Sequence, residues 1–189
     1  MKILPWKKIG EPEVLAKSYG RRLFLQQFEN PYTKEVATYS QFGGSAFSCI
    51  VMAITENNEV LATRQYRHGA DRIILELPGG NPKNSEQSPE DVAREELFEE
   101  SFGYVPNEIT KLNPEPLWID PVSFAFHFHA FLGLGCKQSD KKGKLDDGEY
   151  IELVKIPVKE WVDQCMNGTI TDSKSVIVTM LAMRRLSQQ

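Results

Sequence analysis

Residues 76–104 read ELPGGNPKNSEQSPEDVAREELFEESFGY and carry the strongest structural signal of the chain. They join the end of a strand, a turn at Gly79 and Gly80, a polar loop and an acidic helix. Ser88 is a favourable N-cap, and Pro89 suits the first helical position because its missing N–H would have no partner there. The sequence therefore predicts a helix that begins at Ser88.

Three glutamates of this helix share one face. Glu96, Glu99 and Glu100 are spaced i, i+3, i+4, so they lie within about one turn. Grouped like charges repel unless a cation lies between them, and hard divalent cations take oxygen ligands and share their coordination with substrate phosphates. An isolated pattern of this kind is more often a solvated acidic face. The adjacent Gly-Gly turn favours a site for Mg²⁺, with Mn²⁺ as an alternative.

The stretch resembles the Nudix box, the signature of hydrolases that cleave nucleoside diphosphates linked to another moiety. The family pattern is G-x5-E-x7-R-E-U-x-E-E-x-G-U, where U is a bulky apolar residue. Counted forward from Gly80, the pattern meets Glu86 and Arg94 but then places its paired glutamates out of register. Anchored on the helix, the resemblance makes Glu99 and Glu100 the pair, and this second register is preferred.

The preferred register departs from the family pattern at three positions. Glu95 takes the place of the arginine, with Arg94 displaced by one; Gln87 takes the place of the loop glutamate; and Phe102 is inserted before Gly103, the expected helix C-cap. In the family the arginine supports the glutamates electrostatically, whereas Glu95 would oppose them. The resemblance is therefore to a shifted box.

A second resemblance lies upstream of the helix. RQYR at residues 64–67 and ELPGG at residues 76–80 are similar to the RQYR…ELPAG pattern of the ADP-ribose pyrophosphatase branch. Guanidinium groups bind phosphate bidentately, so Arg64 and Arg67 are substrate-binding candidates, with plain surface arginines as the alternative. Their odd spacing puts them on opposite strand faces, and Arg67 is nearer the strand end.

The resemblance also implies roles for single residues. Glu76 would contact substrate or orient the site, and the Gly80 carbonyl would ligate metal together with Glu96, Glu99 and Glu100.

The C-terminal third resembles the same branch. Residues 148–181 read GEYIELVKIPVKEWVDQCMNGTITDSKSVIVTML, an acidic loop followed by a strand, a helix, a G-x-I-x-D turn and a last helix. In that branch a loop glutamate is the general base, which makes Glu149 and Asp147 catalytic candidates, beside a box glutamate such as Glu100. A mobile carboxylate suits water activation, although composition alone equally predicts a solvated acidic loop.

Bulk properties indicate a soluble globular protein. The 189 residues are 41% hydrophobic and 25% charged with a net charge of −4, which gives no reason to expect nucleic acid. No segment approaches the ~20 apolar residues of a membrane span. Cys49, Cys136 and Cys165 are scattered, which indicates free thiols in a reducing compartment, and the cytoplasm is the default location.

The N-terminal part is predicted to differ from the rest. Residues 1–18 indicate a loose arm, and residues 19–28 and 35–42 a hairpin. We expect residues 1–44 to be an arm and hairpin available for dimerisation, because the resembled branch commonly builds a homodimer there. A Nudix hydrolase domain would follow at residues 45–189.

The later elements complete the fold prediction. Residues 46–55 form an apolar run typical of a strand buried on both faces, residues 109–119 an edge strand broken by prolines, and residues 136–148 a mobile loop. The last helix carries an apolar stripe of Val176, Ile177, Met180 and Leu181. The order of elements fits the α/β class and the Nudix fold, an α/β/α sandwich with a mixed β-sheet.

We assign no chemical role to the two histidines of residues 124–134. His127 and His129 lie at i, i+2 and could ligate a transition metal, but no cysteine, third histidine or nearby carboxylate completes such a set. A half-buried strand with polar residues on one face is the better explanation.

The resemblance implies a divalent-metal-dependent hydrolase that cleaves the diphosphate of a nucleoside diphosphate sugar, with ADP-ribose as the first substrate to consider. Its alternative is a catalytically weak or inactive Nudix-fold module that binds nucleotides. An interaction protein with a charged helix is a third interpretation, but it must treat three patterns in the correct order as coincidences.

Overall fold

The computed structural model describes residues 2–188, and these separate into two compact units. One comprises residues 2–46 and 118–127, and the other residues 47–117 and 128–188. Among the described residues, no helix is both long enough and apolar enough to span a membrane.

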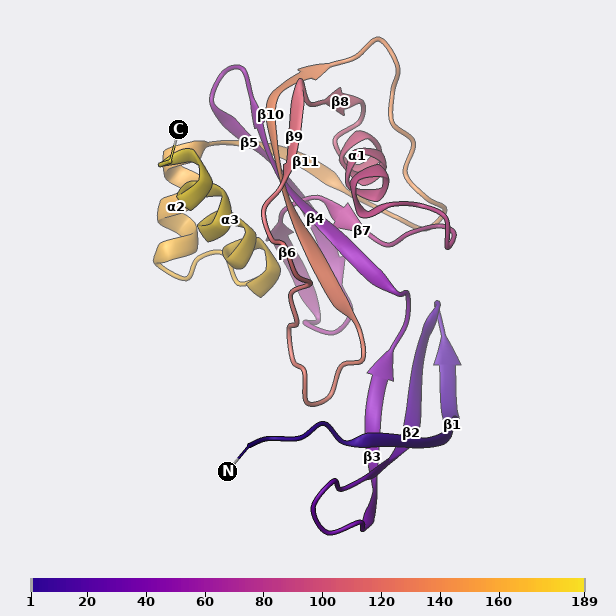
Figure 1. The fold of residues 1–189 in the computed structure, drawn as a ribbon. Helices are drawn as coiled ribbons and strands as arrows, with labels where there is room; N and C mark the ends of the chain where they lie inside the picture. The colour runs from indigo at the N-terminus through magenta and orange to yellow at the C-terminus, as the bar shows by residue number, and fades with distance from the viewer. Residues whose placement is uncertain (1, 189) are drawn as a thin grey trace. The chain divides into compact units, whose positions relative to one another are not determined.

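The first unit is built on a three-stranded antiparallel sheet. The strands β1 (Lys7–Ser18), β2 (Arg21–Glu29) and β3 (Val36–Gly43) follow one another in the order β1-β2-β3 (Figure 1). The predicted hairpin is confirmed as β2 and β3. The prediction of a loose arm is wrong from residue 7 onward, because β1 pairs with β2 over its length. Nearly all of its side chains are exposed, so hydrophobic alternation gave no sign of a strand.

A distant segment joins this unit through backbone hydrogen bonds. The N–H of Phe42 donates to the carbonyl of Ser123 at 2.8 Å, and the N–H of Ala125 donates to the carbonyl of Phe42 at 2.8 Å. The rings of Phe42 and Phe124 pack edge to face. Residues 118–127 thus extend a unit that otherwise lies at the start of the chain.

The second unit is an α/β/α sandwich with a mixed sheet, as predicted. Its path runs β11-β5-β4-β10-β8, with β6 beside β5, β7 beside β4 and β9 beside β10. Helix α1 covers one face, and α2 and α3 cover the other (Figure 1). The bounds are β4 Phe47–Thr55, β5 Glu59–Arg67, β6 Arg72–Glu76, β7 Gly79–Gly80, α1 Pro89–Glu100, β8 Tyr104–Val105, β9 Glu108–Lys111, β10 His127–Gln138, β11 Glu152–Pro157, α2 Val158–Met166 and α3 Ser173–Leu186.

Strand β4 is the centre of both cores. Its even-numbered side chains Ile50, Met52 and Ile54 belong to the cluster under α2 and α3. Its odd-numbered side chains, such as Val51 and Ala53, belong to the cluster under α1. The continuous apolar run of the sequence therefore marks a strand buried on both faces, as predicted.

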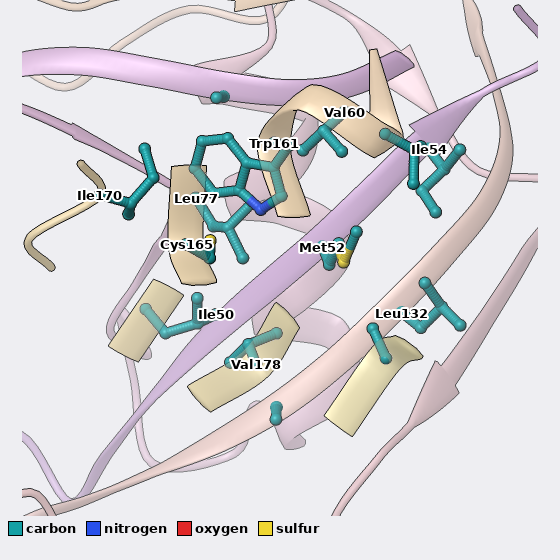
Figure 2. Close-up of a cluster of buried hydrophobic side chains, with 14 of the residues drawn as sticks. Ile50, Met52, Ile54, Val60, Leu77, Leu132, Trp161, Cys165, Ile170 and Val178 are labelled. Carbon is teal, nitrogen blue, oxygen red and sulfur yellow. The ribbon is translucent and has the colours of Figure 1, made fainter. Parts of the chain in front are cut away.

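Trp161 of α2 anchors the core under α2 and α3. Its side chain is fully buried near Met52 and Val178 (Figure 2). Its indole N–H donates to Oγ1 of Thr179 on α3 at 2.8 Å, which gives this buried donor an acceptor and ties the two helices together.

The predicted apolar stripe of α3 is in part wrong. Met180 is 59% exposed, whereas the fully buried positions are Ser175, Val178, Thr179 and Ala182, which follow i, i+3, i+4, i+7. The other predicted members, Val176, Ile177 and Leu181, are only partly buried beside the core. The buried face carries small side chains, which let the helix pack close to β4. The prediction assumed that the larger apolar side chains would be the buried ones, and it therefore chose the wrong face.

Two further boundaries differ from prediction. The predicted strand at residues 109–119 is reduced to β9, which pairs with β10 at an edge, and Leu117 adds one isolated bridge to Phe128. The predicted loop at residues 136–148 begins later, because β10 continues to Gln138.

Replacing Thr179 by valine tests the buried link between the helices. The change keeps the shape but leaves the Trp161 N–H without its acceptor, so we expect a loss of about 1–3 kcal/mol in the free energy of unfolding. Urea denaturation followed by fluorescence measures it. The matched control is Met180→Ala on the exposed face of the same helix, expected to change stability by less than about 0.5 kcal/mol. Equal losses in the two variants would contradict this assignment of faces.

Candidate active site

Helix α1 begins as predicted and ends earlier than predicted. The Ser88 hydroxyl accepts the Asp91 N–H, and the Asp91 carboxylate accepts the Ser88 N–H, which completes a capping box before Pro89. The C-cap is Ser101 rather than the predicted Gly103. Phe102 has φ +57°, a left-handed conformation that favours glycine, so the chain leaves the helix under local strain.

The carboxyl groups of Glu96 and Glu100 lie against the Gly79–Gly80 turn. Glu100 is 3% exposed, and its Oε2 accepts the Gly79 N–H at 2.7 Å. A Cβ atom at Gly80 would lie 2.4 Å from Cδ of Glu96, and one at Gly79 would lie 2.1 Å from the Cys49 carbonyl oxygen. Only glycine therefore fits at residue 79, and a side chain at residue 80 would displace the Glu96 carboxyl group.

These two carboxyl groups are held in an environment that disfavours their charge. Burial raises the pKa of Glu96 to about 7, and the charges of Glu99 and Glu149 add to the shift. Burial also raises the pKa of Glu100 to about 8, opposed by the Gly79 N–H and increased by Glu96. Within residues 2–188 neither Glu96 nor Glu100 forms a salt bridge. The pair would be stabilised by a cation that the protein itself does not supply.

Lys83 is a residue that sequence reasoning missed. Its ammonium lies 2.8 Å and 3.0 Å from the two carboxylate oxygens of Glu99, 3.0 Å from Glu95 and 3.8 Å from Asp146. These partners come from α1 and from the loop that follows β10. A single lysine in a polar loop has no sequence signal for such contacts, because Glu99 and Asp146 are far from it along the chain.

Gln87 and Glu95, two positions at which the preferred register departs from the family pattern, contact each other. Nε2 of Gln87 donates to Oε2 of Glu95, and Oε1 of Gln87 accepts the N–H of Lys83 at 2.6 Å. Arg94 instead pairs with Glu90 one turn earlier, at 2.9 Å. The positive charge beside the box glutamates is thus that of Lys83.

The two predicted phosphate-binding arginines have different surroundings. Arg67 pairs with Glu76 through Nε and Oε1 at 2.6 Å, and Glu76 is buried. The charge of Arg67 also lowers the pKa of Glu100. Arg64 pairs with Glu152 of β11 at 3.4 Å, and both side chains are exposed.

The loop between β10 and β11 brings Glu149 to the site but not Asp147. The charge of Glu149 contributes to the raised pKa of both Glu96 and Glu100. Its carboxylate accepts the Asp146 N–H at 3.2 Å, which closes a tight turn. Asp147 is exposed at the outside of this turn.

A pocket of about 540 Å³ opens beside this loop. Arg64, Tyr66, Phe102, Glu149 and Tyr150 are among the residues that line it. Its size lies within the range of small-molecule sites, and its lining combines aromatic side chains with one arginine and two carboxylates, Glu149 and Glu152. The strained Phe102 therefore contributes directly to the shape of this pocket.

The donor set fits a hard divalent cation. The carboxylates of the buried Glu100 and the half-buried Glu96, neither with an ion-pair partner within residues 2–188, are oxygen ligands of the kind that Mg²⁺ and Mn²⁺ take. As they stand, no three Asp, Glu, His or Cys side chains in residues 2–188 are grouped to hold a metal ion. The carboxylate of Glu99 is instead paired with the ammonium of Lys83.

The thiol nearest to the site is not a nucleophile. Cys49 pairs with Gly80 across β4 and β7, and burial raises the pKa of its thiol to about 12. Cys136 is also buried with a pKa near 12, and all three cysteines are free, as predicted. The reactive groups at this site are therefore carboxylates and arginines.

Removal of divalent cations should make stability depend on pH. Folding raises the carboxyl pKa of Glu96 and Glu100 above the ordinary 4.5, so the folded state binds protons more tightly. Stability is then full below about pH 4.5 and is lost as pH rises toward 8. In chelator we expect the thermal midpoint to fall by several degrees between pH 6 and pH 8.5, since roughly 2–4 °C correspond to 1 kcal/mol in a domain of this size. Glu100→Gln should flatten this slope; an unchanged slope would contradict the assignment.

Comparisons with known proteins agree with this geometry. The family described as NUDIX domain matches residues 45–169. The ADP-ribose pyrophosphatase of Bacillus subtilis (strain 168) is 25% identical over 178 residues, which cover 93% of this chain and 91% of that protein. The methanol dehydrogenase activator of Bacillus methanolicus is 28% identical over 130 residues, or 67% of this chain and 66% of that protein.

A solved structure shares the fold. The crystal structure of ADP compounds hydrolase superposes with a TM-score of 0.81 at 17% sequence identity, covering 100% of this chain and 98% of that one. At this identity the likeness shows the fold alone. Because the family match spans more than half of the sequence and includes the strand-loop-helix stretch, the chain belongs to the Nudix hydrolase family.

Proposed function

We propose that the protein is a divalent-metal-dependent hydrolase that cleaves the diphosphate linkage of a nucleoside diphosphate sugar, with ADP-ribose as the first candidate. The observation that carries this proposal is the position of the Glu96 and Glu100 carboxyl groups against β7, with Glu100 buried and accepting the Gly79 N–H at 2.7 Å. The name of the B. subtilis relative, which aligns over nearly the whole chain, supports the choice of substrate.

The metal would be held by Glu96, Glu99 and Glu100 together with the Gly80 carbonyl. Nudix proteins typically use divalent metals, and Mg²⁺ or Mn²⁺ fits these oxygen donors. When bound, the ion neutralises charge on the diphosphate and lowers the pKa of a water molecule. Glu99 would leave its contact with Lys83, at least in part, to join the other two carboxylates.

Arg67 would bind the diphosphate. Its pairing with the buried Glu76 fixes the guanidinium through one nitrogen, Nε, and leaves the terminal nitrogens for phosphate oxygens. Removing Arg67 would also leave the buried Glu76 carboxyl group without its ion-pair partner. The variant would therefore lose both substrate binding and folding stability. Arg64, at the pocket, would contact the part of the substrate farther from the metal.

Glu149 would take the proton from the attacking water. It is the loop carboxylate whose charge acts on both Glu96 and Glu100, and it also lines the adjacent pocket. Asp147 and Glu100 are the alternatives for this role. The adjacent pocket, with Tyr66 and Tyr150, would hold the organic group attached to the diphosphate.

A second function is favoured by the altered box. Glu95 and Gln87 form a hydrogen bond with each other at the positions where the family pattern has an arginine and a glutamate. The ammonium of Lys83 forms an ion pair with the carboxylate of Glu99. Such a site could bind a nucleotide sugar with little or no turnover. In either case residues 45–189, apart from residues 118–127, which belong to the N-terminal unit, would form the nucleotide-handling domain, and residues 1–44 are the proposed dimerisation element of a homodimer in the cytoplasm.

A substrate panel distinguishes the two functions. The purified protein is incubated with ADP-ribose, other nucleoside diphosphate sugars, dinucleotides and nucleoside triphosphates, with Mg²⁺, with Mn²⁺ and with chelator. Product monophosphates are detected by coupled phosphatase release of phosphate. We expect turnover of a diphosphate sugar that chelator abolishes. Binding of the same compound without turnover under both metals would establish the binding module instead.

Glu100→Gln tests the carboxylate pair directly. The amide oxygen of glutamine can still accept the Gly79 N–H, while the ionised ligand is lost, so we expect turnover to fall by about two to four orders of magnitude. The thermal midpoint in chelator at pH 8 should stay equal or rise, because like-charge repulsion is relieved. The control is Glu90→Gln on the exposed side of the same helix. Parallel loss of folding and activity would argue against a dedicated metal site.

A further inference from the structure

We propose that Lys83 is a positioning residue that tethers the loop of residues 139–151 to helix α1 and thereby places Glu149 at the carboxyl pair. The tether itself is a property of the folded chain. Its effect on turnover rests on the proposed function, in which Glu149 accepts a proton.

Residues 146–149 of the loop and the helix face that they meet are both acidic. The helix presents Glu95, Glu96, Glu99 and Glu100, and the loop presents Asp146 and Glu149. Lys83 contacts Glu95 and Glu99 on one side and Asp146 on the other, so one ammonium group lies between the two sets of charges. Exposed ion pairs contribute little singly, but several carboxylates around one cation act as a network. Without this cation the loop would face uncompensated repulsion.

The first half of the loop is held independently of Lys83. The Ser139 N–H donates to the Gly103 carbonyl at 2.9 Å, and Nε2 of Gln138 donates to the Phe102 carbonyl at 2.7 Å. Gly143 packs so closely that a Cβ would lie 2.0 Å from the Phe98 carbonyl oxygen. The backbone therefore follows the end of α1 as far as Gly143, and the acidic residues come after that point.

The second half of the loop transmits the position of Asp146 to Glu149. The Glu149 N–H donates to the Asp146 carbonyl at 3.1 Å, and the Glu149 carboxylate accepts the Asp146 N–H at 3.2 Å. These two bonds make residues 146–149 one tight turn. Fixing Asp146 by an ion pair consequently fixes Glu149 as well.

Lys83 is itself fixed at its backbone. Its N–H donates to Oε1 of Gln87 at 2.6 Å, while Nε2 of the same glutamine donates to Glu95. The lysine is thus anchored to α1 through Gln87 at one end and through Glu95 and Glu99 at the other. A side chain that is held at both ends loses less conformational freedom when it makes a further contact, and this makes the weak contact with Asp146 effective.

Limited proteolysis with trypsin in the presence of chelator tests the tether without reference to activity. Lys144 lies beyond the independently held first half of the loop, and trypsin reaches it when the second half leaves the helix, whereas Lys141 and Lys142 lie within the held part. We expect Lys83→Met to speed cleavage at Lys144 by about tenfold, and Lys83→Arg to restore the original rate. The matched control is Arg94→Met, which removes the same charge from the outer side of α1. Its loop cleavage should equal that of the unaltered protein.

Two proteolysis results would overturn the tether. One is an unchanged rate of loop cleavage in Lys83→Met. The other is an equal acceleration at Lys159 of α2, which would show general loosening of the fold rather than release of the loop. The double variant Lys83→Met/Asp146→Asn should be cleaved no faster than Lys83→Met, because both changes break one contact; additive acceleration would show that the two residues act separately.

Kinetics then test the positioning role. With the substrate that the panel identifies, Lys83→Met should lower kcat by about tenfold and change KM by less than about twofold, because placement of Glu149 affects the chemical step rather than binding. Accelerated loop cleavage with an unchanged kcat would overturn the link to Glu149. If the unaltered protein turns over nothing, the proposed hydrolase function fails, while the proteolysis result still decides the tether.

Discussion

The close approach of two glutamates to the backbone of the Gly79–Gly80 turn is the constraint on which the site depends. Strand β4 pairs with β7, the Gly79–Gly80 strand, on one side, and α1 packs over it. The Cys49 carbonyl leaves no room for a side chain at Gly79, and the Glu96 carboxyl group lies where a Cβ of residue 80 would be. The buried face of α1 and the interior strand β4 hold this distance through the apolar cluster that contains Val92 and Leu97. The carboxyl groups of Glu96 and Glu100 are therefore positioned by the hydrophobic core. The packing of that core offsets the unfavourable free energy of holding two carboxylates close together.

Negative charge exceeds positive charge around Gly79 and Gly80. Arg67 is paired with Glu76 and Lys83 with Glu99, so neither cation forms an ion pair with Glu96 or Glu100. The folded protein is therefore poised for a multivalent cation, and any ion that binds only the folded state will add to its stability by mass action. A site that gives up stability in order to bind its ligand is a common compromise between folding and function.

Local sequence patterns were sufficient to predict some helices and strands but gave no indication of others. The run of β4 and the Ser88 cap were predictable because each depends on neighbours within a few residues. Strand β1 was missed because its pairing is carried by the backbone while its side chains face solvent. The buried face of α3 was assigned wrongly because close packing against β4 favours small residues, and Met180 was left outside. The role of Lys83 was not predicted, because ion pairs between segments far apart in the chain leave no periodic pattern in the sequence.

The segment at residues 118–127 makes the N-terminal unit discontinuous in sequence. Phe42 accepts and donates backbone hydrogen bonds with this segment, which lies about 80 residues later in the chain. The unit therefore cannot be completed until most of the protein has been synthesised. A fragment that starts at residue 45 would carry Ser123, Phe124 and Ala125 without their backbone and ring partner, so the natural boundary for dissecting this protein is not a single cut in the chain.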